Sequence, residues 1–80
     1  MMSMMSMFAS DRRLKKNIEL VGKSPSGLNI YNFEYTFKEG VFQGVMSDEI
    51  PTEAVVVNSF DTGYDAVDYS KIDVEFKKIG

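Results

Sequence analysis

The stretch NIYNFEYTF, residues 29–37, decides the fold. From residue 31 onward, aromatic and polar side chains alternate. The aromatic positions are Tyr31, Phe33, Tyr35 and Phe37. A period of two predicts a β-strand that buries one face. Such a stripe could stack on sugars or bases, but at this spacing it is far more typical of a hydrophobic core.

Shorter patterns on both sides of this strand indicate further strands. Turn residues at 22–27 and 38–40 bound it, and residues 41–46 are expected to form its hairpin partner. Additional strands are expected at residues 54–57, 64–69 and 72–77. We predict an α+β fold class, a small β-rich domain of four or five mainly antiparallel strands with little helix.

One segment stays ambiguous at this level. Leu14, Ile18 and Val21 have helical spacing, whereas the alternation of Ile18 with Leu20 suits a strand equally well. The pattern does not decide between the two.

Length and composition exclude several classes of protein. Eighty residues allow one domain, and the absence of cysteine and histidine removes disulfides, thiol chemistry, finger-type zinc sites and imidazole bases. We predict no metal and no cofactor. A net charge of -3 gives no general electrostatic support for nucleic-acid binding. The apolar fraction of 44% is too high for a disordered tail, and so small a fold without cross-links is expected to associate with copies or neighbours.

The first nine residues form an uncharged apolar tail, distinct in composition from residues 10–80. Flexible methionines suit irregular apolar surfaces, so we predict partner contacts by this tail. The residues concerned are Met1, Met2, Met4, Met5, Met7 and Phe8. A bilayer span needs about 20 apolar residues, and an anchoring helix normally carries basic residues, so no membrane contact is expected. A membrane-active tail remains the weakest of the alternatives.

Four stretches, in order, carry a resemblance to a known family. They are SDRRLKKNI at 10–18, GLNIYNFEY at 27–35, GVMSDEI at 44–50 and AVDYSKI at 66–72. Together they resemble the intramolecular chaperone domain of phage tailspikes and tail fibres, also called the peptidase S74 domain. In that family the domain helps three fibre chains to assemble and then cuts itself off just before a serine, which acts with a lysine five residues later.

The resemblance implies a role in the bacteriophage virion. We expect a structural or assembly protein of the tail or tail fibre, made in the host cytoplasm, with other virion tail proteins as partners and a homotrimer as its oligomer. It also implies a catalytic pair, Ser10 and Lys15, and a scissile bond between Ala9 and Ser10. Self-cleavage by this pair is the alternative to a purely structural role.

The chemistry of such a pair can be stated from the residues themselves. A serine hydroxyl is a weak nucleophile until a base removes its proton. Without histidine, a neutral lysine amine is the natural base, and its pKa must fall well below the ordinary value of about 10.4. Arg12, Arg13 and Lys16 could supply a positive field that lowers it. Asp11 opposes this effect unless an arginine pairs with it. A serine and an aspartate before a charged run are also common in a simple N-cap or turn.

Overall fold

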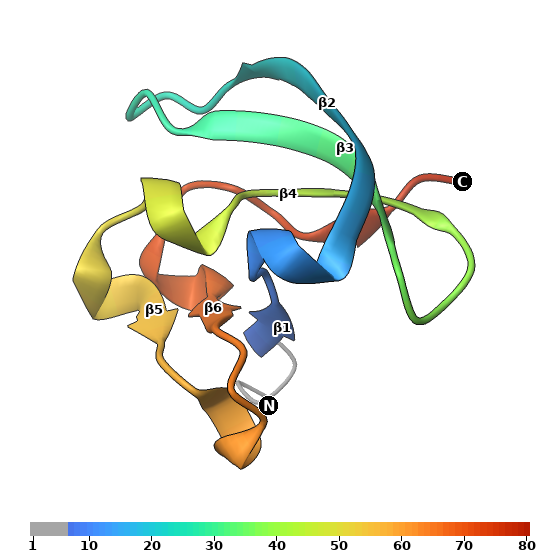
Figure 1. The fold of residues 1–80 in the computed structure, drawn as a ribbon. Coiled ribbons are helices and arrows are strands. Elements are labelled where there is room, and N and C mark those ends of the chain that lie inside the picture. The colour runs from blue at the N-terminus through green and yellow to red at the C-terminus, as the bar shows by residue number, and fades with distance from the viewer. Residues whose placement is uncertain (1–6) are drawn as a thin grey trace.

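The computed structural model describes residues 7–80 and shows two antiparallel sheets (Figure 1). The smaller sheet has the strand order β1-β6-β5, and the larger has the order β2-β3-β4-β7. The strands are β1 (Met7–Ala9), β2 (Lys15–Lys23), β3 (Asn29–Tyr35), β4 (Val41–Gly44), β5 (Val55–Val56), β6 (Ala66–Asp68) and β7 (Lys77–Lys78). Within the described residues, helix occurs only as single 3₁₀ turns, at Arg12–Leu14, Ser47–Glu49, Thr52–Ala54, Ser59–Asp61 and Tyr69–Lys71.

The predicted fold class is confirmed: the domain is small, β-rich and antiparallel, with little helix. Seven strands are present in the described part, more than the four or five expected, because short strands of two or three residues accompany the longer ones. The ambiguous segment after residue 14 is the strand β2, which pairs with β3. Its register shifts twice, and Asn17 in the first irregular stretch has a left-handed backbone with φ of 52°.

The aromatic stripe of β3 forms one of two neighbouring cores. Tyr31, Phe33 and Tyr35 are buried with Phe42 and Met46, as the period of two predicts. Phe37 is an exception, since it lies beyond the end of β3 and is 59% exposed. The second core joins the two sheets and consists of Val45, Val67, Tyr69 and Val74.

The prediction of a strand over residues 72–77 is wrong for most of its length, because only Lys77–Lys78 form β7. In the register of β4 with β7, Gln43 lies opposite Lys77, which would place Val45 opposite Glu75. The N–H of Val45 instead donates to the Tyr69 hydroxyl, and its carbonyl accepts from Lys15. Side chains therefore occupy the backbone groups that a longer β7 would need.

The division between residues 1–9 and 10–80 rests on composition. Residues 1–6 lie outside the described part. Met7–Ala9 form β1 and pair with β6 in the smaller sheet. The last three residues of the apolar segment are therefore part of the folded sheet.

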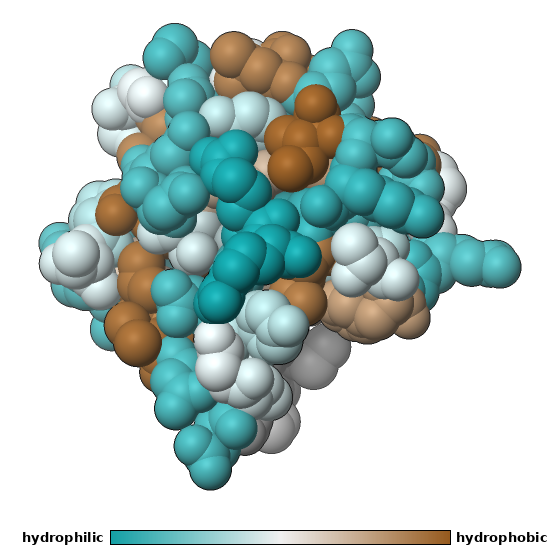
Figure 2. Space-filling model, viewed as in Figure 1, coloured by the Kyte–Doolittle hydropathy of each residue, from teal (hydrophilic) through white to brown (hydrophobic). Residues whose placement is uncertain are grey.

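The surface is mixed in character. Figure 2 shows strongly hydrophilic side chains gathered over the centre of one face, with hydrophobic side chains in separate places around them. Large hydrophobic residues that are exposed lie on several different elements, namely Leu20, Val21, Phe37, Val57, Tyr64 and Ile79.

Candidate active site

Ser10 lies in the interior, where the chain passes from β1 into the first 3₁₀ turn. The residue is completely buried. Its N–H donates to the Asp65 carbonyl at 3.2 Å, and its carbonyl accepts from the N–H of Ser47 at 2.9 Å. Its hydroxyl oxygen lies 3.2 Å from the hydroxyl oxygen of Tyr69. Backbone contacts from two distant segments therefore hold Ser10 in place.

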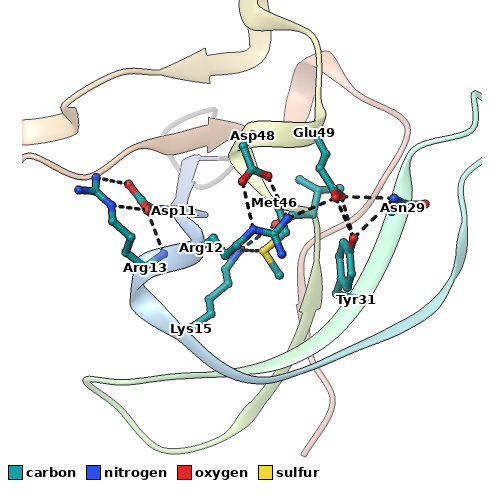
Figure 3. Close-up of polar contacts among 10 residues, drawn as sticks. Asp11, Arg12, Arg13, Lys15, Asn29, Tyr31, Met46, Asp48 and Glu49 are labelled. Atoms are coloured by element: carbon teal, nitrogen blue, oxygen red, sulfur yellow. Dashed lines mark hydrogen bonds and ion pairs between the residues drawn. The ribbon is translucent and has the colours of Figure 1, made fainter.

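Lys15, the first residue of β2, points into the same interior and is only 7% exposed. Its Nζ donates to the Val45 carbonyl at 2.7 Å and lies 3.6 Å from Met46 Sδ (Figure 3). The same nitrogen lies 4.2 Å from the centre of the Phe33 ring. These partners are uncharged, so they compensate little for the lost hydration of an ammonium group.

This environment lowers the pKa of the Lys15 amine to about 7, chiefly through burial and then through the positive charge of Arg12. A lysine with this pKa is neutral in about half of the molecules at pH 7. A lysine base for serine needs a pKa well below the ordinary value, and Lys15 has one.

The charged residues around Lys15 are arranged in pairs. Arg12 binds Asp48 through two hydrogen bonds of 3.0 Å and Glu49 through one of 3.2 Å. Asp11 is paired with Arg13 at 2.7 and 2.9 Å. Pairing with Arg13 does not remove the effect of Asp11, because the charges of Asp11 and Asp48 both still raise the pKa of Lys15, and burial with Arg12 outweighs them.

Two backbone groups also bind the Asp11 carboxylate. The Asp11 carboxylate also accepts from the backbone N–H groups of Arg13 and Asp65. The Arg13 side chain above all, and then these two N–H groups, hold the pKa of Asp11 far below its usual range. Among the three predicted sources of positive field, Arg12 lowers the pKa of Lys15, whereas Arg13 and Lys16 are not among the causes.

Val45 and Tyr69 connect Ser10 with Lys15. Among the described residues the two predicted catalytic side chains are not hydrogen-bonded to each other. Instead, Lys15 donates to the Val45 carbonyl, the Val45 N–H donates to the Tyr69 hydroxyl at 3.0 Å, and that hydroxyl lies next to Ser10. Gly44 makes room for this arrangement, because a Cβ there would clash with the Tyr69 hydroxyl oxygen.

The peptide bond before Ser10 is held at its other end by Tyr35. The Tyr35 hydroxyl donates to the Ala9 carbonyl oxygen at 2.5 Å. Burial, with a smaller contribution from Tyr69, raises the pKa of Tyr35, so the hydroxyl stays protonated at neutral pH.

The four stretches of the resemblance meet at this site. Ser10 and Lys15 come from the first, Phe33 and Tyr35 from the second, Val45 and Met46 from the third, and Tyr69 from the fourth. Sequence reasoning missed the roles of Tyr35 and Tyr69. Their signal was a tyrosine in place of phenylalanine at a core position, since a buried hydroxyl requires a partner.

The residues predicted to bind a partner are described only in part. Met1, Met2, Met4 and Met5 lie outside the described residues, and Met7 is known here only as a backbone position of β1. The Phe8 ring is partly buried and stacks on Phe76, with ring centres 4.0 Å apart. Partner binding by this segment stays a prediction.

Two further features concern the described residues only. Between residues 7 and 80, no group of three or more acidic side chains is placed to hold a metal ion. No helix in that part of the chain has the length and apolar character required to cross a membrane.

Comparisons with protein-family models, curated proteins and solved structures found no match.

Proposed function

We propose that this chain is a self-cleaving assembly module of a bacteriophage tail or tail fibre, with Ser10 as nucleophile and Lys15 as general base. The observation that carries the proposal is the burial of the Lys15 amine against uncharged partners, which lowers its pKa to about 7. These surroundings contain no carboxylate to stabilise a charged lysine, whereas a base for serine requires a neutral amine.

The reaction follows from the position of Ser10 directly after the scissile bond. The neutral amine of Lys15 takes the Ser10 hydroxyl proton, and the Ser10 oxygen attacks the Ala9 carbonyl carbon. The Ala9–Ser10 C–N bond then breaks, and the Ser10 nitrogen receives a proton from the Lys15 ammonium. The resulting ester is hydrolysed by water, which leaves a carboxylate on Ala9 and a free amine on Ser10.

In the structure the nucleophile and the base are not yet in contact, so it represents the state before the reaction. Lys15 donates to the Val45 carbonyl and Ser10 contacts Tyr69, so the proton transfer requires the two side chains to exchange these partners. Catalytic hydrogen bonds are often long or absent before the reacting state forms. In the proposed assembly, contact with other copies favours that change.

Intact mass of freshly synthesised protein tests the cleavage. Wild type is expected to lose residues 1–9, whereas Ser10→Ala and Lys15→Ala retain them. Ser24→Ala is the matched control for a buried serine, and Lys16→Ala for a neighbouring exposed lysine. Both controls should be cleaved like wild type. A full-length wild-type mass under all assembly conditions would reject the reaction.

The structural part of the proposal is a homotrimer that works with other virion tail proteins. It is supported by the resemblance, by the small size of the domain and by the lack of cross-links. Light scattering of the purified chain and its location in intact phage particles test it. A stable monomer that is absent from the particle would contradict the virion role, even if cleavage were observed.

A further inference from the structure

We propose that Tyr35 is a third catalytic residue, whose hydroxyl polarises the Ala9 carbonyl and stabilises the negative charge that develops on its oxygen during cleavage. This inference rests on the proposed self-cleavage and adds a residue to its machinery. Tyr35 touches the reacting group directly, since its hydroxyl lies 2.5 Å from the Ala9 oxygen.

The register of two strand pairs brings these groups together. Ser10 and Asp65 lie one position beyond the β1–β6 pairing, and the Ser10 N–H donates to the Asp65 carbonyl, so this position has the orientation of a hydrogen-bonded pair. The preceding pair, Ala9 with Ala66, is therefore a position whose backbone groups point away from the partner strand. The Ala9 carbonyl consequently faces β3 and the Tyr35 hydroxyl rather than β6.

The second register places Tyr35 beside the base. Lys15 of β2 lies directly opposite Tyr35 of β3, so their side chains leave the sheet on the same face. Tyr35 is itself 4% exposed and packs against Phe33 and Phe42, with ring centres 5.2 and 5.1 Å away. A phenol held in this way needs little reorganisation when the carbonyl becomes an oxyanion.

Both polar groups of the scissile peptide are therefore held before the reaction begins. Tyr35 holds the carbonyl, and Asp65 accepts the N–H of the departing nitrogen. When the Ser10 oxygen–carbon bond forms, the carbonyl π electrons move to the Ala9 oxygen, where Tyr35 donates its hydrogen bond. When the C–N bond breaks, that electron pair returns to form the ester carbonyl, and Tyr35 keeps its proton throughout.

The test compares Tyr35→Phe with Tyr31→Phe. Tyr31 is the matched control, because it is a buried tyrosine on the same face of the same strand whose hydroxyl binds Glu49 instead. In time-resolved intact mass after cell-free synthesis, Tyr35→Phe is expected to slow cleavage about 100- to 1000-fold, the usual effect of removing one oxyanion donor. Tyr31→Phe should cleave at about the wild-type rate.

The pH profile separates this role from an effect on Lys15. The slowed Tyr35→Phe reaction should keep the wild-type pH midpoint, because the base is unchanged. A shifted midpoint, or an unchanged rate, overturns the inference while leaving the proposed cleavage intact. Absence of cleavage in wild type overturns both. Should Tyr35→Phe fail to fold, a site-specific fluorotyrosine at position 35 provides the second variant. As a stronger donor it must accelerate cleavage, and a rate equal to or below wild type rejects the inference.

A spectroscopic readout isolates the hydrogen bond itself. Ala9–Ser10 is the only alanine–serine pair in the sequence, so labelling alanine with ¹³C at the carbonyl and serine with ¹⁵N gives a single correlation peak. In a Lys15→Met background, which keeps the bond uncleaved, Tyr35→Phe should move this carbonyl resonance upfield and Tyr31→Phe should not. An unmoved resonance in the Tyr35 variant would contradict the proposed contact.

Discussion

Replacing Lys15 by methionine is expected to abolish a specific dependence of stability on pH. The unfolded chain holds its proton on Lys15 up to a pKa of about 10.4, whereas burial and Arg12 lower the pKa in the folded protein to about 7. Between these values the unfolded state binds more protons than the folded state. Wild-type stability must therefore rise as the pH increases from 7 toward 10 and be lost as the pH falls again.

The magnitude follows from the two pKa values. Integrating the proton difference from pH 7 to pH 9 gives a gain of about 2 kcal/mol in the free energy of unfolding. At pH 7 the burial of Lys15 costs about 4 kcal/mol relative to a chain whose lysine is already neutral. Methionine avoids this cost but leaves the Val45 carbonyl without its donor, a loss of about 1 kcal/mol. We therefore expect Lys15→Met to be more stable than the parent by about 3 kcal/mol at pH 7.

The composition of the chain removes most other causes of a pH-dependent stability in this range. The chain contains no histidine and no cysteine, so no other side-chain type ordinarily titrates between pH 7 and 9, and the α-amino group is common to both proteins. Urea unfolding at pH 7, 8 and 9, in a Ser10→Ala background that prevents cleavage, gives the slope of the free energy of unfolding against pH for the parent and for Lys15→Met. Parallel slopes for parent and Lys15→Met, or a parent that loses stability on going from pH 7 to 9, would refute the reasoning.

Two further substitutions test the surroundings of the pair. Arg12→Gln removes a positive charge that lowers the pKa of Lys15, so the pH midpoint of cleavage should move upward, and an unchanged midpoint would show that burial acts alone. Gly44→Ala places a Cβ against the Tyr69 hydroxyl and should cost about 1–3 kcal/mol in urea unfolding. Gly22→Ala is its control, because a Cβ there has nothing within 4 Å, and equal losses in both variants would contradict the steric argument.

The sequence predicts the fold where a regular pattern coincides with burial. The alternation in residues 29–37 correctly predicts β3 and the hairpin with β4. A strand with one aromatic and one polar face is stable when the aromatic face is buried and the polar face is not. The same alternation fails at residues 72–77. There Val74 is buried and Phe76 partly buried by packing, and no free backbone edge is left at Val45 for this segment to pair with.

The site was predictable to a different extent. The choice of Ser10 and Lys15 as a catalytic pair comes from the resemblance and stays a prediction, while the structure shows that both residues are buried. Tyr35 and Tyr69 could not be assigned a role from the sequence, because the targets of their hydroxyls lie 26 and 59 residues away along the chain. Such contacts depend on tertiary structure, which no local pattern contains.

The charged residues of this site differ in their partners, and the difference indicates that Lys15 is buried for a reason other than stability. Asp11 has an arginine partner, and Arg12 has two carboxylates. Lys15, more deeply buried than either arginine, instead has a carbonyl, a sulfur and an aromatic ring as its contacts. The fold pairs the other charged groups of this site but leaves Lys15 without a charged partner, at a cost in stability. Such locally unfavourable positions are expected at functional residues. If Lys15→Met stabilises the domain and also abolishes cleavage, the two effects have the same physical origin, which is a lysine amine kept neutral by burial.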